Sequence, residues 1–254
     1  GATPIDASSG VSINGGTAKL VVSGFGTVIP PVSLSLGSLD GNGHINSLTV
    51  ADSAGNTLSA GNGTDTFLET DSMTFQGAAT LNVRGSADLS GQYFVTNSLS
   101  TSSSTDVVVN ATNTSGIWSS GVDYTVIQFS SYLSAVDASH FTLGTVSGLL
   151  GTQSAALVNT GSAIVLRITS EALVWTGGQS SEWTTTPVGG LRNWSLAGNP
   201  VEYSDGNSVS FNDSASRFDV NFTQNVSPGS IVVDNSLNHY TFSSTGNFGI
   251  LTGS

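Results

Sequence analysis

Hydrophobic and polar positions alternate along most of this chain in short groups. The apolar members are mainly β-branched or aromatic, and the gaps between groups hold Gly, Asn, Asp or Ser, which favour turns. No stretch of about ten residues has the apolar spacing of a helix, so the predicted class is all-β. The pattern predicts short strands over residues 18–22, 32–36, 47–50, 66–68, 73–75, 80–83, 93–95, 107–109, 124–129, 141–143, 156–158, 163–168, 209–211, 220–222, 231–233 and 240–242.

Two all-β architectures compete for this pattern. An antiparallel β-sandwich usually has strands of about five or six residues and clear hairpin turns. This chain offers shorter groups joined by irregular polar links, which suit a β-solenoid, because each rung buries its inward side chains on the rungs above and below. We therefore favour a parallel β-helix with rungs of roughly 20 to 25 residues. The antiparallel β-sandwich stays open as the alternative.

Three of the four tryptophans gather in one segment of the chain. Trp175, Trp183 and Trp194 follow a long apolar strand signal over residues 164–168 and a polar break at Ser170 and Glu171. We place a domain boundary at this break. Residues 1–170 are predicted to form a solenoid unit ending in a closing strand, and residues 171–254 to begin a second unit opened by the tryptophan-rich segment.

Two sequence motifs resemble those of a known family: GSLDGNGHINSLTV at residues 37–50 and GNTLSAGN at residues 55–62. They resemble the autotransporter-associated β-strand repeat of bacterial surface and passenger proteins. Residues 121–127 and 163–168 look like the strands that close such a unit, and residues 174–194, 205 and 209–211 resemble the opening of the next one.

The resemblance implies a right-handed parallel β-helix exported to the cell surface, with no cofactor and no shared catalytic site. Pro30-Pro31 departs from the pattern of the first unit, and the chain holds neither a translocating barrel nor a sorting signal. We therefore expect a piece of a longer bacterial protein that is secreted or displayed on the cell surface, with its signal peptide outside these residues. Other segments of that longer chain are expected partners.

Charge narrows the choice of partners. Five Lys and Arg against seventeen Asp and Glu give a net charge of −12 and a pI near 4.1. Such a chain repels polyanions, so we expect no nucleic-acid partner. No apolar run approaches the ~18 residues of a membrane-spanning helix, so no membrane insertion by this chain is expected. The absence of cysteine excludes disulfides and thiolate metal sites.

Candidate catalytic and metal-binding groups are sparse. His44, His140 and His239 lie about a hundred residues apart and lack metal-ligand spacing. No serine nucleophile motif occurs. The densest acidic group, Asp65 with Glu69 and Asp71, is the best candidate for a polysaccharide-degrading site, although a solvated turn explains it more simply. We predict no catalytic residue, no metal site and no cofactor.

The aromatic segment is the best candidate binding surface. Exposed Trp183, Trp194 and Tyr203, with Arg192 beside them, could stack on a carbohydrate or contact a host surface. Buried, the three tryptophans would instead cap a solenoid end or the junction between units. The favoured function is thus a non-catalytic stalk or display segment, the alternative is a glycan- or host-binding adhesin, and a polysaccharide-degrading enzyme ranks third. An open solenoid end would also allow end-to-end self-association.

Overall fold

The computed structural model describes residues 10–22, 28–60, 67–85, 93–102, 106–113, 118–132, 138–186, 190 and 192–251. Within these residues the secondary structure consists of β-strands and one short 3-10 turn, η1 (Ala138–His140), with no α-helix. The prediction of an all-β chain is therefore confirmed.

Contacts divide the chain into two units, close to Ile168. The first unit contains β1 (Val11–Val22), β2 (Val28–Ile29), β3 (Val32–Gly41), β4 (His44–Val50), β5 (Thr57–Ala60), β6 (Phe67–Phe75), β7 (Ala79–Gly85), β8 (Tyr93–Thr101), β9 (Val107–Asn113), β11 (Phe141–Ser147), and most of β10 (Val122–Tyr132), β12 (Gln153–Asn159) and β13 (Ala163–Ser170). The second unit takes Ile168 onward with Ser119–Val122 and Leu149–Ser154. That these units are repeats divided at residue 171 stays a prediction.

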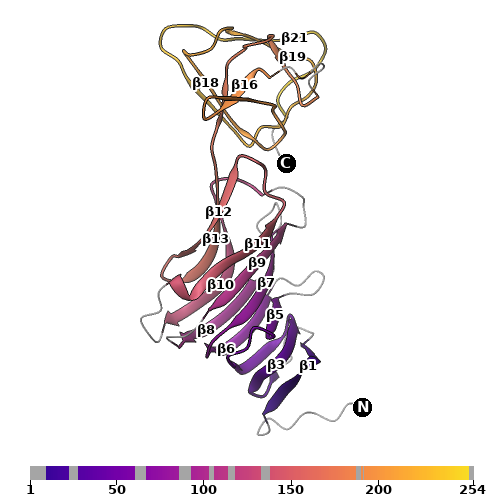
Figure 1. Cartoon of the computed structure of the whole chain (residues 1–254), viewed down its shortest axis with the longest axis vertical. Coiled ribbons are helices and arrows are strands. Elements are labelled where there is room, and N and C mark those ends of the chain that lie inside the picture. Colours follow the sequence, from indigo (N-terminus) through magenta and orange to yellow (C-terminus); the bar gives the residue numbers. More distant parts are fainter. Residues whose placement is uncertain are drawn as a thin grey trace. The chain divides into compact units, whose positions relative to one another are not determined.

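Two columns of parallel strands make up most of the first unit, and Figure 1 shows them side by side. One column runs β4, β6, β8 and β10, and the other runs β3, β5, β7, β9 and β11. Ile45 pairs with Thr70, Leu68 with Phe94, and Phe94 with Ile127, so successive strands of the first column lie 25, 26 and 33 residues apart. The chain thus visits the two columns in turn, so strands that pair within one column are joined through a strand of the other column.

The same sheet is mixed because β13 joins β10 and β12 at one end. Gly121 N–H donates to Ile168 O and Phe129 N–H donates to Ser162 O, while Thr160 N–H donates to Ala163 O across the turn between β12 and β13. Residue numbers rise on one strand as they fall on its neighbour, so these strands run antiparallel. This hairpin-like end, formed around 159–163, differs from the parallel columns before it.

Alternation along each strand places apolar side chains inside the first unit. In β6 the buried positions are Leu68 and Thr70, then Met73 and Phe75, so the inward phase moves by one residue at Asp71 and Ser72. The strands β4 and β8 change phase at the paired positions. These aligned changes of phase place two adjacent side chains outward at the same level of all three strands.

Several strands are longer than the sequence pattern predicted. β1 has twelve residues, β3 has ten, and β6 and β8 have nine each, against predicted groups of three to five. Polar residues such as Thr70 and Thr96 continue the strands, because backbone pairing with the next strand needs no apolar side chain. The strand β5 was not predicted, and Thr66 of the predicted strand 66–68 lies outside the described residues.

The second unit also stacks parallel strands. β14 (Leu173–Trp175), β18 (Ser208–Asn212) and β20 (Ser230–Asp234) pair in parallel, as do β15 (Glu182–Trp183), β19 (Asp219–Phe222) and β21 (Thr241–Ser244). Short β16 (Trp194–Leu196) and β17 (Asn199–Val201) add antiparallel pairs beside β14. An aromatic and aliphatic cluster fills the interior.

Candidate functional site

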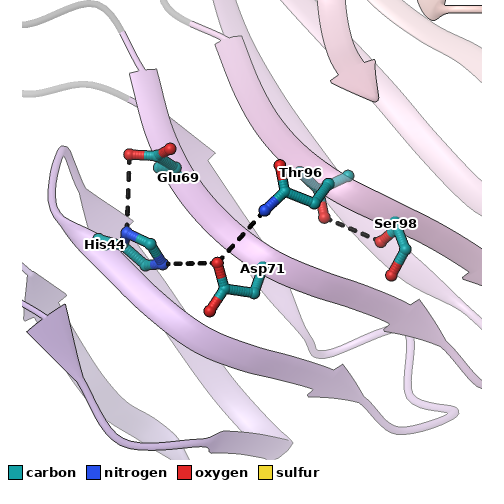
Figure 2. Close-up of polar contacts among 6 residues, drawn as sticks. His44, Glu69, Asp71, Thr96 and Ser98 are labelled. Atoms are coloured by element: carbon teal, nitrogen blue, oxygen red, sulfur yellow. Dashed lines mark hydrogen bonds and ion pairs between the residues drawn. The ribbon is translucent and has the colours of Figure 1, made fainter. Parts of the chain in front are cut away.

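The strands β4, β6 and β8 bring a histidine and two carboxylates together on the outer face of the first unit. Parallel register places His44 directly beside Glu69, while Asp71 follows two residues later on the same face of β6. Asn97 lies on β8, the next strand. Figure 2 shows His44, Glu69 and Asp71 facing one another across these strands. Residues more than twenty positions apart therefore form one polar cluster.

The cluster is held by polar contacts of unequal length. His44 Nε2 lies 3.2 Å from Asp71 Oδ1, and His44 Nδ1 lies 3.7 Å from Glu69 Oε2. Asn97 Nδ2 donates to the same Asp71 oxygen over 3.3 Å. The side chain of His44 is 24% exposed, against 45% for Glu69 and 51% for Asp71. The carboxylates are therefore solvated, and the contacts are weak surface interactions.

Beneath this cluster the neighbouring side chains point inward. Thr96 is buried, and its hydroxyl donates to the carbonyl oxygen of Ser98 over 2.8 Å. Figure 2 shows this contact beside the outward cluster. The hydroxyl is thus used within its own strand, at the residues where the inward phase changes.

The carboxylate group predicted as a hydrolase candidate is only partly described. Glu69 and Asp71 both face His44, whereas Asp65 lies outside the described residues. In the described part of the chain, no group of three or more His, Cys, Asp or Glu side chains could hold a metal ion. His140 Nδ1 lies 2.7 Å from the hydroxyl oxygen of Thr101, rather than in the cluster around His44. Among the described residues, His44, His140 and His239 therefore do not meet in one site.

The predicted aromatic binding residues lie in the core of the second unit. Trp183 is fully buried, Trp194 is 2% exposed and Tyr203 is 1% exposed. The ring centroid of Trp183 lies 5.1 Å from that of Trp194 and 5.3 Å from that of Tyr203, in edge-to-face geometry. Stacking on a sugar requires an exposed ring face, and other aromatic rings cover these faces. The burial therefore removes the basis for predicting glycan contact at these three residues.

Arg192 is the exposed member of the predicted site. Its guanidinium Nε lies 4.0 Å from Glu202 Oε1, at the limit of an ion pair, and both side chains are about half exposed. It borders a surface hollow of about 290 Å³ with Thr176, Gly178, Gln179, Trp194, Ser195, Gly198 and Pro200. Arginine alone supplies no sugar platform here, because the adjacent indole is turned into the core.

A buried asparagine organises the tryptophan segment. Asn193 Oδ1 accepts from the backbone N–H groups of Gln179 and Ser180, over 3.0 and 2.7 Å. Asn193 Nδ2 donates to Ser180 Oγ over 2.7 Å and to Glu182 O over 2.9 Å. The side chain satisfies both its acceptor and its donor in the loop that positions Trp183. Sequence reasoning missed this residue, since a lone asparagine in an Asn-rich chain carries no local signal.

Tyr203 is held in a polar pocket at the edge of the same core. Its hydroxyl donates to Asp205 Oδ1 over 3.1 Å, and Ser227 N–H donates to the same oxygen over 2.7 Å. Burial raises the pKa of the Tyr203 hydroxyl well above its usual range, and the nearby Asp205 carboxylate raises it further. Tyr203 therefore serves as a neutral structural hydrogen-bond donor.

The fold and these sites together define an all-β chain in which strands stack in parallel and polar side chains line the outer face. Comparison with models of known families, with curated proteins and with solved structures found no match. No helix among the described residues is long and apolar enough to cross a membrane. The resemblance to the autotransporter-associated repeat stays a prediction.

Proposed function

We propose that this chain is a non-catalytic structural segment of a large bacterial cell-surface or secreted protein. In this proposal both units are turns of a right-handed parallel β-helix that act as a stalk or passenger scaffold. The observation that carries the proposal is the in-register parallel pairing from β4 through β10 and from β3 through β11. A scaffold of this kind needs stacked backbone ladders and no chemical centre.

Inward side chains supply the stability that such a scaffold needs. Leu58 pairs with Leu81, and Leu81 pairs with Val109, so one position contributes a fully buried aliphatic residue on three successive strands. Burying a side chain of this size contributes about 1.5–3 kcal/mol. Because each strand is covered by the next, the stack loses its interior only when neighbouring rungs open together.

The acidic surface of the chain favours a role in display and disfavours the binding of polyanions. The outer face of the first unit carries exposed acidic and amide groups such as Glu69, Asp71 and Asn97, and the whole chain has a net charge of −12. A surface of this kind stays soluble through charge repulsion and polar hydration. The proposed location outside the cell rests on this composition and on the resemblance described above, and the proposed partners are other segments of the same longer protein.

Protease digestion with a matched pair of variants tests the stacked scaffold. Leu81→Asp places a charge inside β7, whereas Asn82→Asp places the same charge on the outer side of the same strand. Proteinase K should cleave Leu81→Asp rapidly and leave the wild type and Asn82→Asp intact. Equal resistance of both variants would contradict the proposed interior.

Glycan assays test the absence of catalysis. The wild type is incubated with a panel of polysaccharides and mucin-type glycans, and both the release of reducing ends and the retention of protein are measured. We expect neither. Release of reducing ends would overturn the non-catalytic assignment, and retention would replace the scaffold by an adhesin.

A further inference from the structure

Serine and threonine residues from different strands line up on the outer face of the first unit. In β4, β6 and β8 the segments Ser-Leu-Thr at 47–49, Ser-Met-Thr at 72–74 and Ser-Leu-Ser at 98–100 lie in one register. Each segment presents two hydroxyl side chains outward around one buried apolar residue. The row through Thr49 continues to Ser33 on β3 and Ser12 on β1. We call these eight residues the hydroxyl grid: Ser12, Ser33, Ser47, Thr49, Ser72, Thr74, Ser98 and Ser100.

Other outward positions of the same strands are not restricted to hydroxyls. The row through His44 continues to Glu69 and Val95, so one position holds an imidazole, a carboxylate and an aliphatic side chain on successive strands. The parallel strands therefore form with any of these residue types facing outward. The two rows of the hydroxyl grid contain only serine and threonine, which the fold itself does not require.

The hydroxyls of the grid are available to a ligand. Ser12 and Ser33 are exposed, and the other six residues of the grid are partly exposed. Among the described residues, none of the eight hydroxyl groups has a hydrogen-bond partner in the protein. A hydroxyl group both donates and accepts hydrogen bonds. A ligand that matches the grid must therefore offer donors and acceptors together.

Backbone pairing fixes the dimensions of the hydroxyl grid. Paired strands lie about 4.8 Å apart, and alternate residues of one strand lie about 6.7 Å apart. The grid thus repeats in two directions, whereas a single polymer chain repeats in one. It contains no charged side chain, although the net charge of the whole chain is −12. These properties favour a neutral ligand that repeats in two directions.

Ice has these properties. Every water molecule in ice both donates and accepts hydrogen bonds, and the oxygen atoms of a crystal face repeat in two directions at spacings close to those of the grid. The paired backbone holds the hydroxyl-bearing residues in place before binding, which lowers the conformational entropy lost on binding. We propose that the hydroxyl grid is a binding site for the surface of ice. This activity is additional to the proposed scaffold role.

Partition of the protein into slowly growing ice tests the proposal with a matched pair of variants. Thr74→Tyr places an aromatic ring inside the grid, and Thr80→Tyr places the same ring on the outward side of β7, outside the grid. Both threonines are partly exposed, and tyrosine is favoured in strands, so both variants should keep the wild-type circular dichroism spectrum. The ring at residue 74 holds ice away from the neighbouring hydroxyls, and losing about two such contacts weakens binding about tenfold.

The expected results separate the grid from the rest of the surface. The wild type should be enriched in the ice fraction about tenfold over a non-binding protein of similar mass. Thr74→Tyr should lose this enrichment, Ser98→Tyr should lose it by the same change on β8, and Thr80→Tyr should keep it.

Three outcomes would overturn the proposal. The first is a wild type that is not enriched in ice, and the second is equal enrichment of the Thr74→Tyr and Thr80→Tyr variants. The third is retention on crystalline cellulose or chitin that Thr74→Tyr abolishes, which would assign the grid to a crystalline polysaccharide instead. Proteinase K digestion of the Leu81 and Asn82 variants tests the interior of β7, so failure of the scaffold and failure of the ice site are distinguishable.

Discussion

Replacing Asn193 by alanine removes a buried side chain that forms hydrogen bonds with residues 179, 180 and 182, in the loop before Trp183. The side chain makes four hydrogen bonds: it accepts from the backbone N–H groups of Gln179 and Ser180, and it donates to Ser180 Oγ and Glu182 O. Asn193 is 3% exposed, so water does not reach these bonds from its side. In the alanine variant Ser180 Oγ still accepts from Glu182 N–H over 3.2 Å, whereas Ser180 N–H and Glu182 O lose the Asn193 partner.

The expected cost follows from which partners water can reach after the change. Gln179 is exposed, so its N–H can be hydrated, whereas Ser180 and Glu182 are partly buried. Each buried polar group left without a partner costs about 1–3 kcal/mol. With two such groups, the Asn193→Ala variant should lose about 2–6 kcal/mol of unfolding free energy.

Urea unfolding followed by tryptophan fluorescence measures this loss, since Trp175, Trp183 and Trp194 all lie in the core that the loop covers. Asn199→Ala is the matched control, because Asn199 is exposed and its side chain makes one long contact of 3.5 Å with Ala197 O. We expect this control to unfold within about 0.5 kcal/mol of the wild type. A loss at Asn193 no larger than that at Asn199 would refute the reasoning.

Three further predictions concern pH and packing. The raised pKa of Tyr203 means that its contribution to stability is present below the ordinary tyrosine pKa of about 10 and is lost as pH rises through the folded value, so Tyr203→Phe should flatten the alkaline decline in melting temperature. Backbone N–H groups hold the pKa of Asp213 below its usual value, so the stabilisation by its carboxylate is present above about pH 4 and is lost as pH falls through the folded pKa. Asp213→Asn should therefore reduce the dependence of the urea unfolding midpoint on acid pH. An unchanged dependence of the midpoint on pH would contradict the assignment. A methyl group at Gly85 would collide with the ring of Trp118, so Gly85→Ala should cost about 1–3 kcal/mol in thermal melts, whereas Gly151→Ala, which meets open space, should cost much less.

The candidate sites were less predictable than the strands. The period-two pattern located strands such as β7 and β13 because alternation is a local property of the sequence. The exposure of Trp183 was not predictable in this way, since an indole suits both a core and a binding surface. Its burial depends on Phe211 and Phe222, which come from other strands and surround it at 5.5 and 5.3 Å between ring centroids.

The sequence by itself determined that this chain is all-β, acidic and free of disulfides, because these properties depend on residue types and their spacing over a few positions. Only the tertiary structure decided which strands pair and which polar residues meet. His44 Nε2 lies 3.2 Å from Asp71 Oδ1 because β4 and β6 pair in one register. A shift of either strand by one residue would turn its side chain to the other face of the sheet. That register depends on packing between residues about 25 positions apart, which no local pattern encodes.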